Sequence, residues 1–169
     1  IIGAAEALKA ANNLIVLYGS EGIGYQASQS LASASAFLLQ ETGNTGKTNS
    51  GLIAVWDAPN AQGAWENGVI PSENVLADVK ATKVTYLVGV GFAADEKLAK
   101  AVQSSGFVVV QDLRMTDTAK LADVVLPAQA VTERDGSYLS GERRLQRFYP
   151  AIPAPAQTKP DYLITAMIA

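Results

Sequence analysis

Short apolar runs alternate along the chain with segments in which apolar residues recur at helical spacing. The runs are rich in Val, Ile and Leu and end at glycine or a polar residue, as strands buried on both faces do. Predicted strands are residues 14–19, 52–56, 84–91, 107–112 and 123–127, and predicted helices are residues 6–10, 23–39, 76–81, 95–104 and 117–122. This alternation predicts an α/β fold with a doubly wound, mainly parallel sheet of about five strands and helices on both faces.

The predicted organisation is one domain followed by a connection. A chain of 169 residues suits a single domain with a hydrophobic core. Residues 1–149 are predicted to form this domain. Residues 150–169 are predicted to be a proline-rich connection and the start of a further segment, because four prolines between 150 and 160 keep the backbone extended. The chain begins with Ile1 and ends within an apolar pattern, so we expect a fragment of a longer protein.

Composition removes several classes of function. The net charge of -3 argues against non-specific nucleic-acid binding and against a basic membrane-binding patch. The longest apolar runs fall short of the roughly 18–20 residues that span a bilayer, so we expect no direct membrane insertion. The chain has no Cys and no His, which excludes thiolate iron–sulfur sites, zinc sites and His-based triads within it. Only carboxylate-type metal sites remain possible, and we expect no metal site and no catalytic residue here.

The candidate binding site follows from the predicted topology. Ligands of open parallel sheets bind at the carboxyl ends of the strands. The residues predicted to line such a crevice are Gly19, Gly22, Gly24, Gly89, Gly91 and Asp112. The first three are expected to form a turn with positive φ. Asp112 either caps the turn after its strand or hydrogen-bonds a base or ribose, and the cap is the commoner role of aspartate.

Two glycine-rich loops resemble nucleotide-binding motifs only in part. "YGSEGIG" reads G-x-x-G-x-G, whereas the dinucleotide fingerprint is G-x-G-x-x-G, and Glu21 would oppose a phosphate. "GNTGKT" has Glu41 where a phosphate-binding loop needs its first glycine, and it follows a helix instead of a strand. It is predicted to be a helix-to-strand loop with Gly43 near the helix C-cap.

The arginines are concentrated in one region. The chain has five, and four of them lie between residues 134 and 147. Arg143, Arg144 and Arg147 are expected to lie outside the main sheet and to dock against another part of a parent subunit, with Phe148 and Tyr149 beside them. A solvated basic turn is the alternative that charge patterning leaves open.

Motifs in the second half of the chain carry a family resemblance. In chain order they are Asp112, Thr116–Ala119, Ala122–Pro127, Glu133, Asp135–Gly136 and Gly141–Arg143. With this order the chain resembles the molybdopterin oxidoreductase superfamily. "NAQGAWENGVIP" (residues 60–71), with "TGKTNSGL" before it, is similar more narrowly to the large iron–sulfur subunit of respiratory complex I, the NADH–quinone oxidoreductase.

This resemblance implies a Rossmann-like domain, the third of the molybdopterin-binding architecture. The domain would be a scaffold without redox centres in a complex that moves electrons from NADH through iron–sulfur clusters to quinone. Its partners would be other domains of the parent subunit and other complex I subunits. Its location would be the cytoplasmic side of the inner membrane, in a peripheral arm. No cofactor is expected within the chain itself.

Two other functions remain open. In molybdenum or tungsten members such as formate dehydrogenases, this domain holds one guanine-dinucleotide half of the molybdopterin cofactor. A stand-alone dinucleotide-binding module is the third candidate. Two departures from the family pattern weigh against a retained cofactor. "SYLSGERRLQ" has Ser where Asn is common and Gly-Glu where Glu-Gly is common, and "VGFAAD" replaces an Asn-Pro turn.

Overall fold

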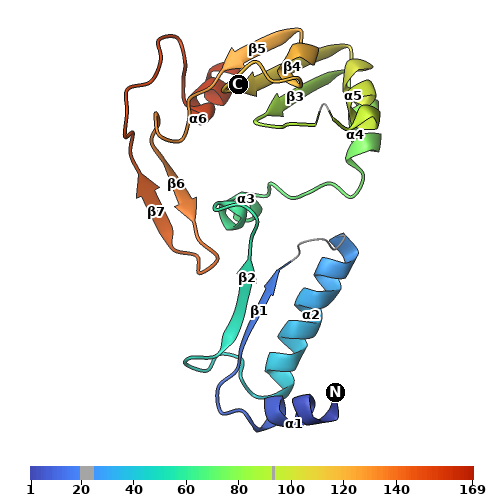
Figure 1. Cartoon of the computed structure of the whole chain (residues 1–169), viewed down its shortest axis with the longest axis vertical. Coiled ribbons are helices and arrows are strands. Elements are labelled where there is room, and N and C mark those ends of the chain that lie inside the picture. Colours follow the sequence, from blue (N-terminus) through green and yellow to red (C-terminus); the bar gives the residue numbers. More distant parts are fainter. Residues whose placement is uncertain (20–24, 93) are drawn as a thin grey trace. The chain divides into compact units, whose positions relative to one another are not determined.

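The computed structural model describes residues 1–19, 25–92 and 94–169 and divides the chain into two compact units (Figure 1). The first unit comprises Ile1–Ile70 and Tyr138–Gln146, and the second comprises Pro71–Ser137 and Arg147–Ala169. Each unit contains parallel strands joined by helices. The predicted α/β class is thereby confirmed.

The first unit is built on one βαβ crossover. Its elements are α1 (Ile2–Ala10), β1 (Ile15–Gly19), α2 (Tyr25–Glu41), β2 (Gly51–Val55) and α3 (Ala61–Glu66). The two strands run parallel with Ile15 opposite Gly51 and Leu17 opposite Ile53. Helix α2 connects them and contacts both. The connection is long enough to reverse the chain, as parallel pairing requires.

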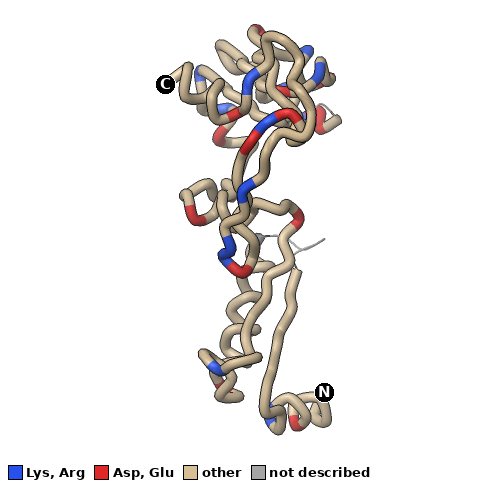
Figure 2. Tube along the Cα trace, turned by 90° about the vertical axis from the view of Figure 1, so that its left-hand side faces the viewer, with Lys and Arg blue, Asp and Glu red and all other residues tan. Residues whose placement is uncertain are grey.

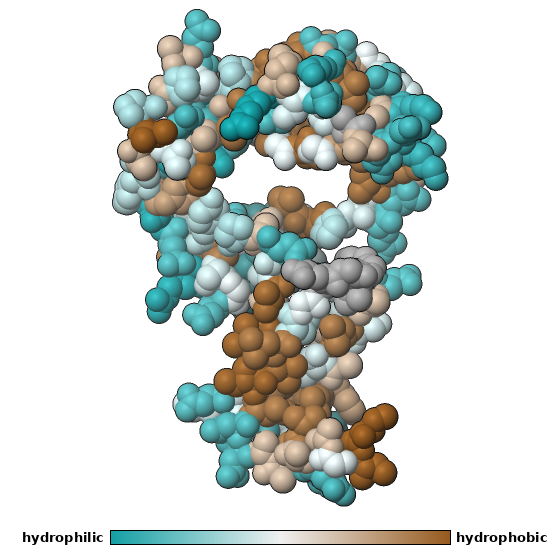
Figure 3. Space-filling view, viewed as in Figure 1, coloured by the Kyte–Doolittle hydropathy of each residue, from teal (hydrophilic) through white to brown (hydrophobic). Residues whose placement is uncertain are grey.

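One face of this two-stranded sheet carries exposed aliphatic side chains. Leu17 is 66% exposed and Val55 54%, and Ile15 and Ile53 lie on the same face by register. Figure 3 shows apolar side chains gathered over β1 and β2 in the lower part of the view. The first strand was expected to be buried on both faces. Within its own unit this expectation is not met, because the face that carries Leu17 is exposed.

The loop between α2 and β2 is fixed by a buried asparagine. Gly43 has a φ of 65° directly after α2, as predicted for a helix C-cap. Asn44 is fully buried, and its amide nitrogen donates to the carbonyl and hydroxyl oxygens of Thr42 (3.1 Å each). Its side-chain oxygen accepts from the Ser50 hydroxyl (3.0 Å), which in turn accepts from the backbone N–H of Leu14 (3.1 Å). These bonds join the starts of both strands.

The second unit contains a three-stranded parallel sheet in the order β3-β4-β5. Its elements are α4 (Val75–Ala81), β3 (Val84–Val88), α5 (Glu96–Gln103), β4 (Phe107–Asp112), η1 (Ala119–Leu121), β5 (Val124–Pro127) and α6 (Asp161–Ile168). One cluster of buried apolar side chains forms its core, consisting of Phe92, Val102, Val108, Val110 and Ala119. The Asp95 side chain caps α5 by accepting from the N–H groups of Lys97 and Leu98.

Three features differ from the sequence prediction or extend it. The five predicted strands are divided between a two-stranded and a three-stranded sheet. A further hairpin, β6 (Gly136–Leu139) and β7 (Leu145–Phe148), occupies the arginine-rich segment. Helix α6 forms where only a connection and the start of a segment were expected. The predicted domain boundary between residues 149 and 150 stays a prediction.

Candidate functional site

At the carboxyl edge of the β3-β4-β5 sheet, the backbone at Gly89 and Gly91 is not covered by neighbouring side chains of the described residues. Gly89, directly after β3, has a φ of 60°, and its N–H donates to the carbonyl oxygen of Gln111 (2.9 Å). Apart from each glycine and its two chain neighbours, no heavy atom of the described ranges lies within 4 Å of the position that a Cβ would take at Gly89 or Gly91. The left-handed φ favours glycine at position 89. A ligand can therefore approach this backbone closely.

Asp112 ends β4 at the same edge. The Leu113 N–H donates to its Oδ1 (2.6 Å), and the Thr116 hydroxyl donates to its Oδ2 (3.2 Å). The side chain thus bonds within the turn that follows its strand, in line with the first of its two predicted roles. An ionised carboxylate offers about four lone-pair sites, so each oxygen of Asp112 keeps capacity to accept a further hydrogen bond. The side chain is half-buried, which leaves it accessible.

The loop after Asp112 presents three exposed side chains that the sequence reasoning did not single out. Leu113 is 54% exposed and Met115 61% exposed, although both are apolar. Arg114 between them is also exposed, and its guanidinium forms no ion pair with another residue of the described ranges. The signal was available, since these residues continue directly from a strand end at the carboxyl edge.

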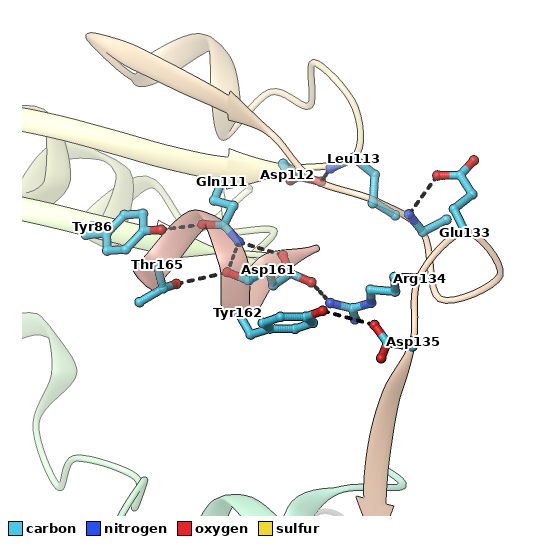
Figure 4. A network of polar contacts seen from close by, with 11 residues as sticks. Tyr86, Gln111, Asp112, Leu113, Glu133, Arg134, Asp135, Asp161, Tyr162 and Thr165 are labelled. Carbon is cyan, nitrogen blue, oxygen red and sulfur yellow. Dashed lines mark hydrogen bonds and ion pairs between the residues drawn. The ribbon is translucent and has the colours of Figure 1, made fainter. Parts of the chain in front are cut away.

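A polar network joins β4 to the last helix (Figure 4). Gln111 is fully buried, accepts from the Tyr86 hydroxyl at Oε1, and donates from Nε2 to Oδ1 of Asp161 (2.7 Å). Asp161, the first residue of α6, also forms an ion pair with Arg134. The Nε atom of Arg134 is buried and has no hydrogen-bond partner among the described residues. The residue next to Asp112 is therefore held by the C-terminal helix.

A second pair of contacts lies beside this network. Asp135 accepts from the Tyr162 hydroxyl (3.0 Å) and from Nη2 of Arg147 (3.2 Å). The Tyr162 hydrogen bond, assisted by the charge of Arg147, holds the pKa of the Asp135 carboxyl below its usual value. The same bond raises the pKa of Tyr162. The Arg147 guanidinium also lies 5.2 Å from the centre of the Tyr149 ring.

The other two clustered arginines sit at the tip of the β6–β7 hairpin. Arg143 has a φ of 60°, a left-handed conformation, and its Nε lies 3.0 Å from Oε1 of Glu66 within the first unit. The backbone N–H of Arg144 donates to the Ser140 hydroxyl (3.2 Å). Figure 2 shows basic and acidic residues interspersed along the trace. Docking of Arg143, Arg144 and Arg147 against another part of a parent subunit stays a prediction.

The structure describes only part of the predicted crevice. Gly19 ends β1 and does not have a left-handed φ, while Gly22 and Gly24 lie outside the described residues. Gly19 belongs to the first unit, whereas Gly89, Gly91 and Asp112 belong to the second. A single crevice lined by all six residues therefore stays a prediction. The edge formed by Gly89, Gly91 and Asp112 is the part whose geometry is known.

Neither a metal-binding cluster nor a membrane-spanning helix is present in the described ranges. Residues 1–19, 25–92 and 94–169 contain no group of three or more carboxylates arranged to hold a metal ion. In the same part of the chain, no helix has both the length and the apolar character needed to cross a membrane.

Known proteins give an independent comparison. A family model described as molybdopterin oxidoreductase matches residues 4–169. Over its whole length the chain is 31% identical to F420-dependent formate dehydrogenase 2 subunit alpha of Methanococcus maripaludis and covers 30% of that protein. It is 30% identical, again over its whole length, to putative formate dehydrogenase YrhE of Bacillus subtilis and covers 21% of it. Over 76% of its length it is 30% identical to F420-dependent formate dehydrogenase subunit alpha of Methanocaldococcus jannaschii, covering 24% of that protein. The chain thus spans less than a third of the length of these relatives.

Proposed function

The chain belongs to the molybdopterin oxidoreductase family, and we propose that it is the part of a formate dehydrogenase that binds the guanine nucleotide of the cofactor. The observation that carries the proposal is the full-length match to proteins named as formate dehydrogenases, with a further match to an alpha subunit of an F420-dependent enzyme. These names favour a formate dehydrogenase over the large iron–sulfur subunit of complex I. The scaffold role in complex I, with its place on the cytoplasmic side of the inner membrane, becomes the second candidate.

The donor set at the carboxyl edge fits a guanine nucleotide. Guanine carries two adjacent hydrogen-bond donors on its Watson–Crick edge, and a carboxylate that keeps free lone pairs on both oxygens can accept both. Asp112 is such a carboxylate. The open backbone at Gly89 and Gly91 admits a bulky group, and the exposed guanidinium of Arg114 suits the charge of a diphosphate.

The roles of these residues are binding and orientation. The bound cofactor supplies the redox chemistry, and the chain itself holds the nucleotide end of it. Asp112 would select guanine, Gly89 and Gly91 would leave room for the phosphates, and Arg114 would offset their charge. Residues outside this chain would complete the enzyme and contact formate.

Nucleotide selectivity tests this proposal. The 169-residue chain is titrated calorimetrically with GDP, ADP and xanthosine diphosphate, before and after the substitution Asp112→Asn. We expect the wild-type chain to bind GDP in preference to ADP. An asparagine presents a donor as well as an acceptor, so Asp112→Asn should weaken GDP binding about 10- to 100-fold and favour xanthosine diphosphate.

Asp117→Asn is the matched control, because Asp117 is an exposed aspartate that pairs with Lys120 after the same strand. It should leave all three affinities unchanged. If the wild-type chain does not bind GDP, the proposed nucleotide site is wrong. The cofactor-free scaffold domain then becomes the better explanation of the chain's function.

A further inference from the structure

We propose that Thr116 is a positioning residue that gives Asp112 its selectivity for guanine over bases with a single donor. The inference rests on the proposed function and extends it by assigning a residue that need not touch the nucleotide. The evidence for it is the pair of hydrogen bonds made by the Thr116 hydroxyl, which link Asp112 to the turn that follows it.

The Thr116 hydroxyl donates one hydrogen bond and accepts another. Its oxygen accepts the backbone N–H of Ala119 (3.1 Å), and its proton is donated to Oδ2 of Asp112 (3.2 Å). The carbonyl oxygen of Thr116 accepts the N–H of Lys120 (3.0 Å), which holds the backbone in the same turn. A hydroxyl with an occupied acceptor site and a fixed backbone is a preorganised donor.

Two donors therefore fix the plane of the Asp112 carboxylate. The Leu113 N–H holds Oδ1 and Thr116 holds Oδ2. Without the second contact the carboxylate turns more freely, because rotation about its terminal torsion has a broad, roughly two-fold profile. The backbone bond from the N–H of Ala128 does not replace this contact, because it goes to the backbone oxygen of Asp112 (3.1 Å) and not to its carboxylate.

The consequence differs between ligands. A base that donates two parallel hydrogen bonds needs both carboxylate oxygens in one plane, whereas a base that donates one needs only one oxygen. Guanine is of the first kind, and hypoxanthine, which lacks the 2-amino group, is of the second. Thr116 should therefore contribute more to binding of GDP than to binding of inosine diphosphate.

The test compares the two ligands in the full chain and four variants. Thr116→Val removes the hydroxyl at nearly constant shape, Thr116→Ala removes it without the bulk, and Thr116→Ser retains it. Thr82→Val is the matched control, since the Thr82 hydroxyl caps α4 through the carbonyl of Val79 (2.9 Å) before β3 begins. Calorimetry gives the affinities for GDP and inosine diphosphate, and circular dichroism confirms that each variant is folded.

We expect Thr116→Val and Thr116→Ala to lower GDP affinity about tenfold, with inosine diphosphate affinity nearly unchanged. Thr116→Ser and Thr82→Val should keep the wild-type ratio. Equal losses for both ligands, or an unchanged ratio in the folded Val or Ala variant, would overturn the inference. If the inference fails in this way while Asp112→Asn still weakens GDP binding, the proposed function is not affected. A wild-type chain that does not bind GDP removes both.

Discussion

The second unit buries a cluster of five apolar side chains around Val102 and Val110, both of them fully buried. In the first unit the fully buried side chain of largest volume is that of Asn44, and aliphatic residues of β1 and β2 are exposed. Each unit is built on parallel strands. Similar local topology thus comes with a cluster of buried apolar side chains in the second unit. In the described part of the first unit, the buried apolar side chains Leu14 and Leu39 accompany a hydrogen-bonded loop.

The difference separates two sources of stability. Burial of apolar area stabilises a fold roughly in proportion to the area removed from water. A buried amide contributes less in net terms, but its loss is costly because its partners are left unsatisfied. We therefore expect the second unit to respond to side-chain volume and the first unit to respond to hydrogen-bonding capacity.

The largest effect should come from the core of the second unit. Phe92 is nearly buried in the apolar cluster, and Phe92→Ala should destabilise this unit by about 3–5 kcal/mol through lost burial and a cavity. Leu17→Ala, at an exposed position of β1, should change stability by less than about 0.5 kcal/mol. Native-state hydrogen exchange read peptide by peptide measures both units. Comparable losses of stability in Phe92→Ala and Leu17→Ala would contradict the expected difference between the two units.

An intermediate effect is expected in the first unit. Asn44→Ala deletes the bonds to Thr42 and leaves the Ser50 hydroxyl without its acceptor, so it should cost about 1–3 kcal/mol. Asn13→Ala, at an exposed asparagine before β1, should be nearly neutral. Chemical denaturation followed by tryptophan fluorescence suits this unit, because Trp56 and Trp65 both lie in it. A neutral Asn44→Ala would show that the loop is not held by this amide.

The smallest effect concerns pH and the surface of the second unit. The folded pKa of Asp135 lies below its unfolded value, mainly because Tyr162 donates to it. Its contribution to stability is therefore complete above about pH 4 and is lost as the pH falls through the folded pKa. Tyr162→Phe should raise the pKa of Asp135, measured by carboxyl-carbon NMR. It should also reduce the loss of folding stability that occurs as the pH falls below about 4. Tyr149→Phe keeps the ring beside Arg147 and should leave that pKa in place.

Sequence patterns located the elements of the second unit well. The β4 strand begins and ends at the predicted residues, 107 and 112, because a run of one Phe and three Val follows a glycine and gives way to glutamine and aspartate. Thr116 directly precedes the predicted helix at residues 117–122, and its hydroxyl accepts the N–H of Ala119, as a capping side chain does. Local chemistry was sufficient in both places, since strand ends and caps depend on neighbours in sequence.

Contacts between distant residues were not predictable in the same way. The hairpin β6–β7 lacks a two-residue Asn-Gly or Asp-Gly turn, and its left-handed position is occupied by Arg143, a residue that seldom adopts such a φ. Gln111 is the clearest case for the candidate site. A buried glutamine at a strand end can be satisfied by many partners, and its bond to Asp161 joins positions 50 residues apart.

That separation also sets an order of events during synthesis. Ribosomes add about 5–20 residues per second, so Gln111 is made roughly 2.5–10 s before Asp161. The strands of the second sheet can pair in that interval, because β5 is complete at Pro127. The amide of Gln111 finds its aspartate only when the first turn of α6 has left the exit tunnel. Closure of this side of the carboxyl edge of the β3-β4-β5 sheet therefore follows the pairing of its strands.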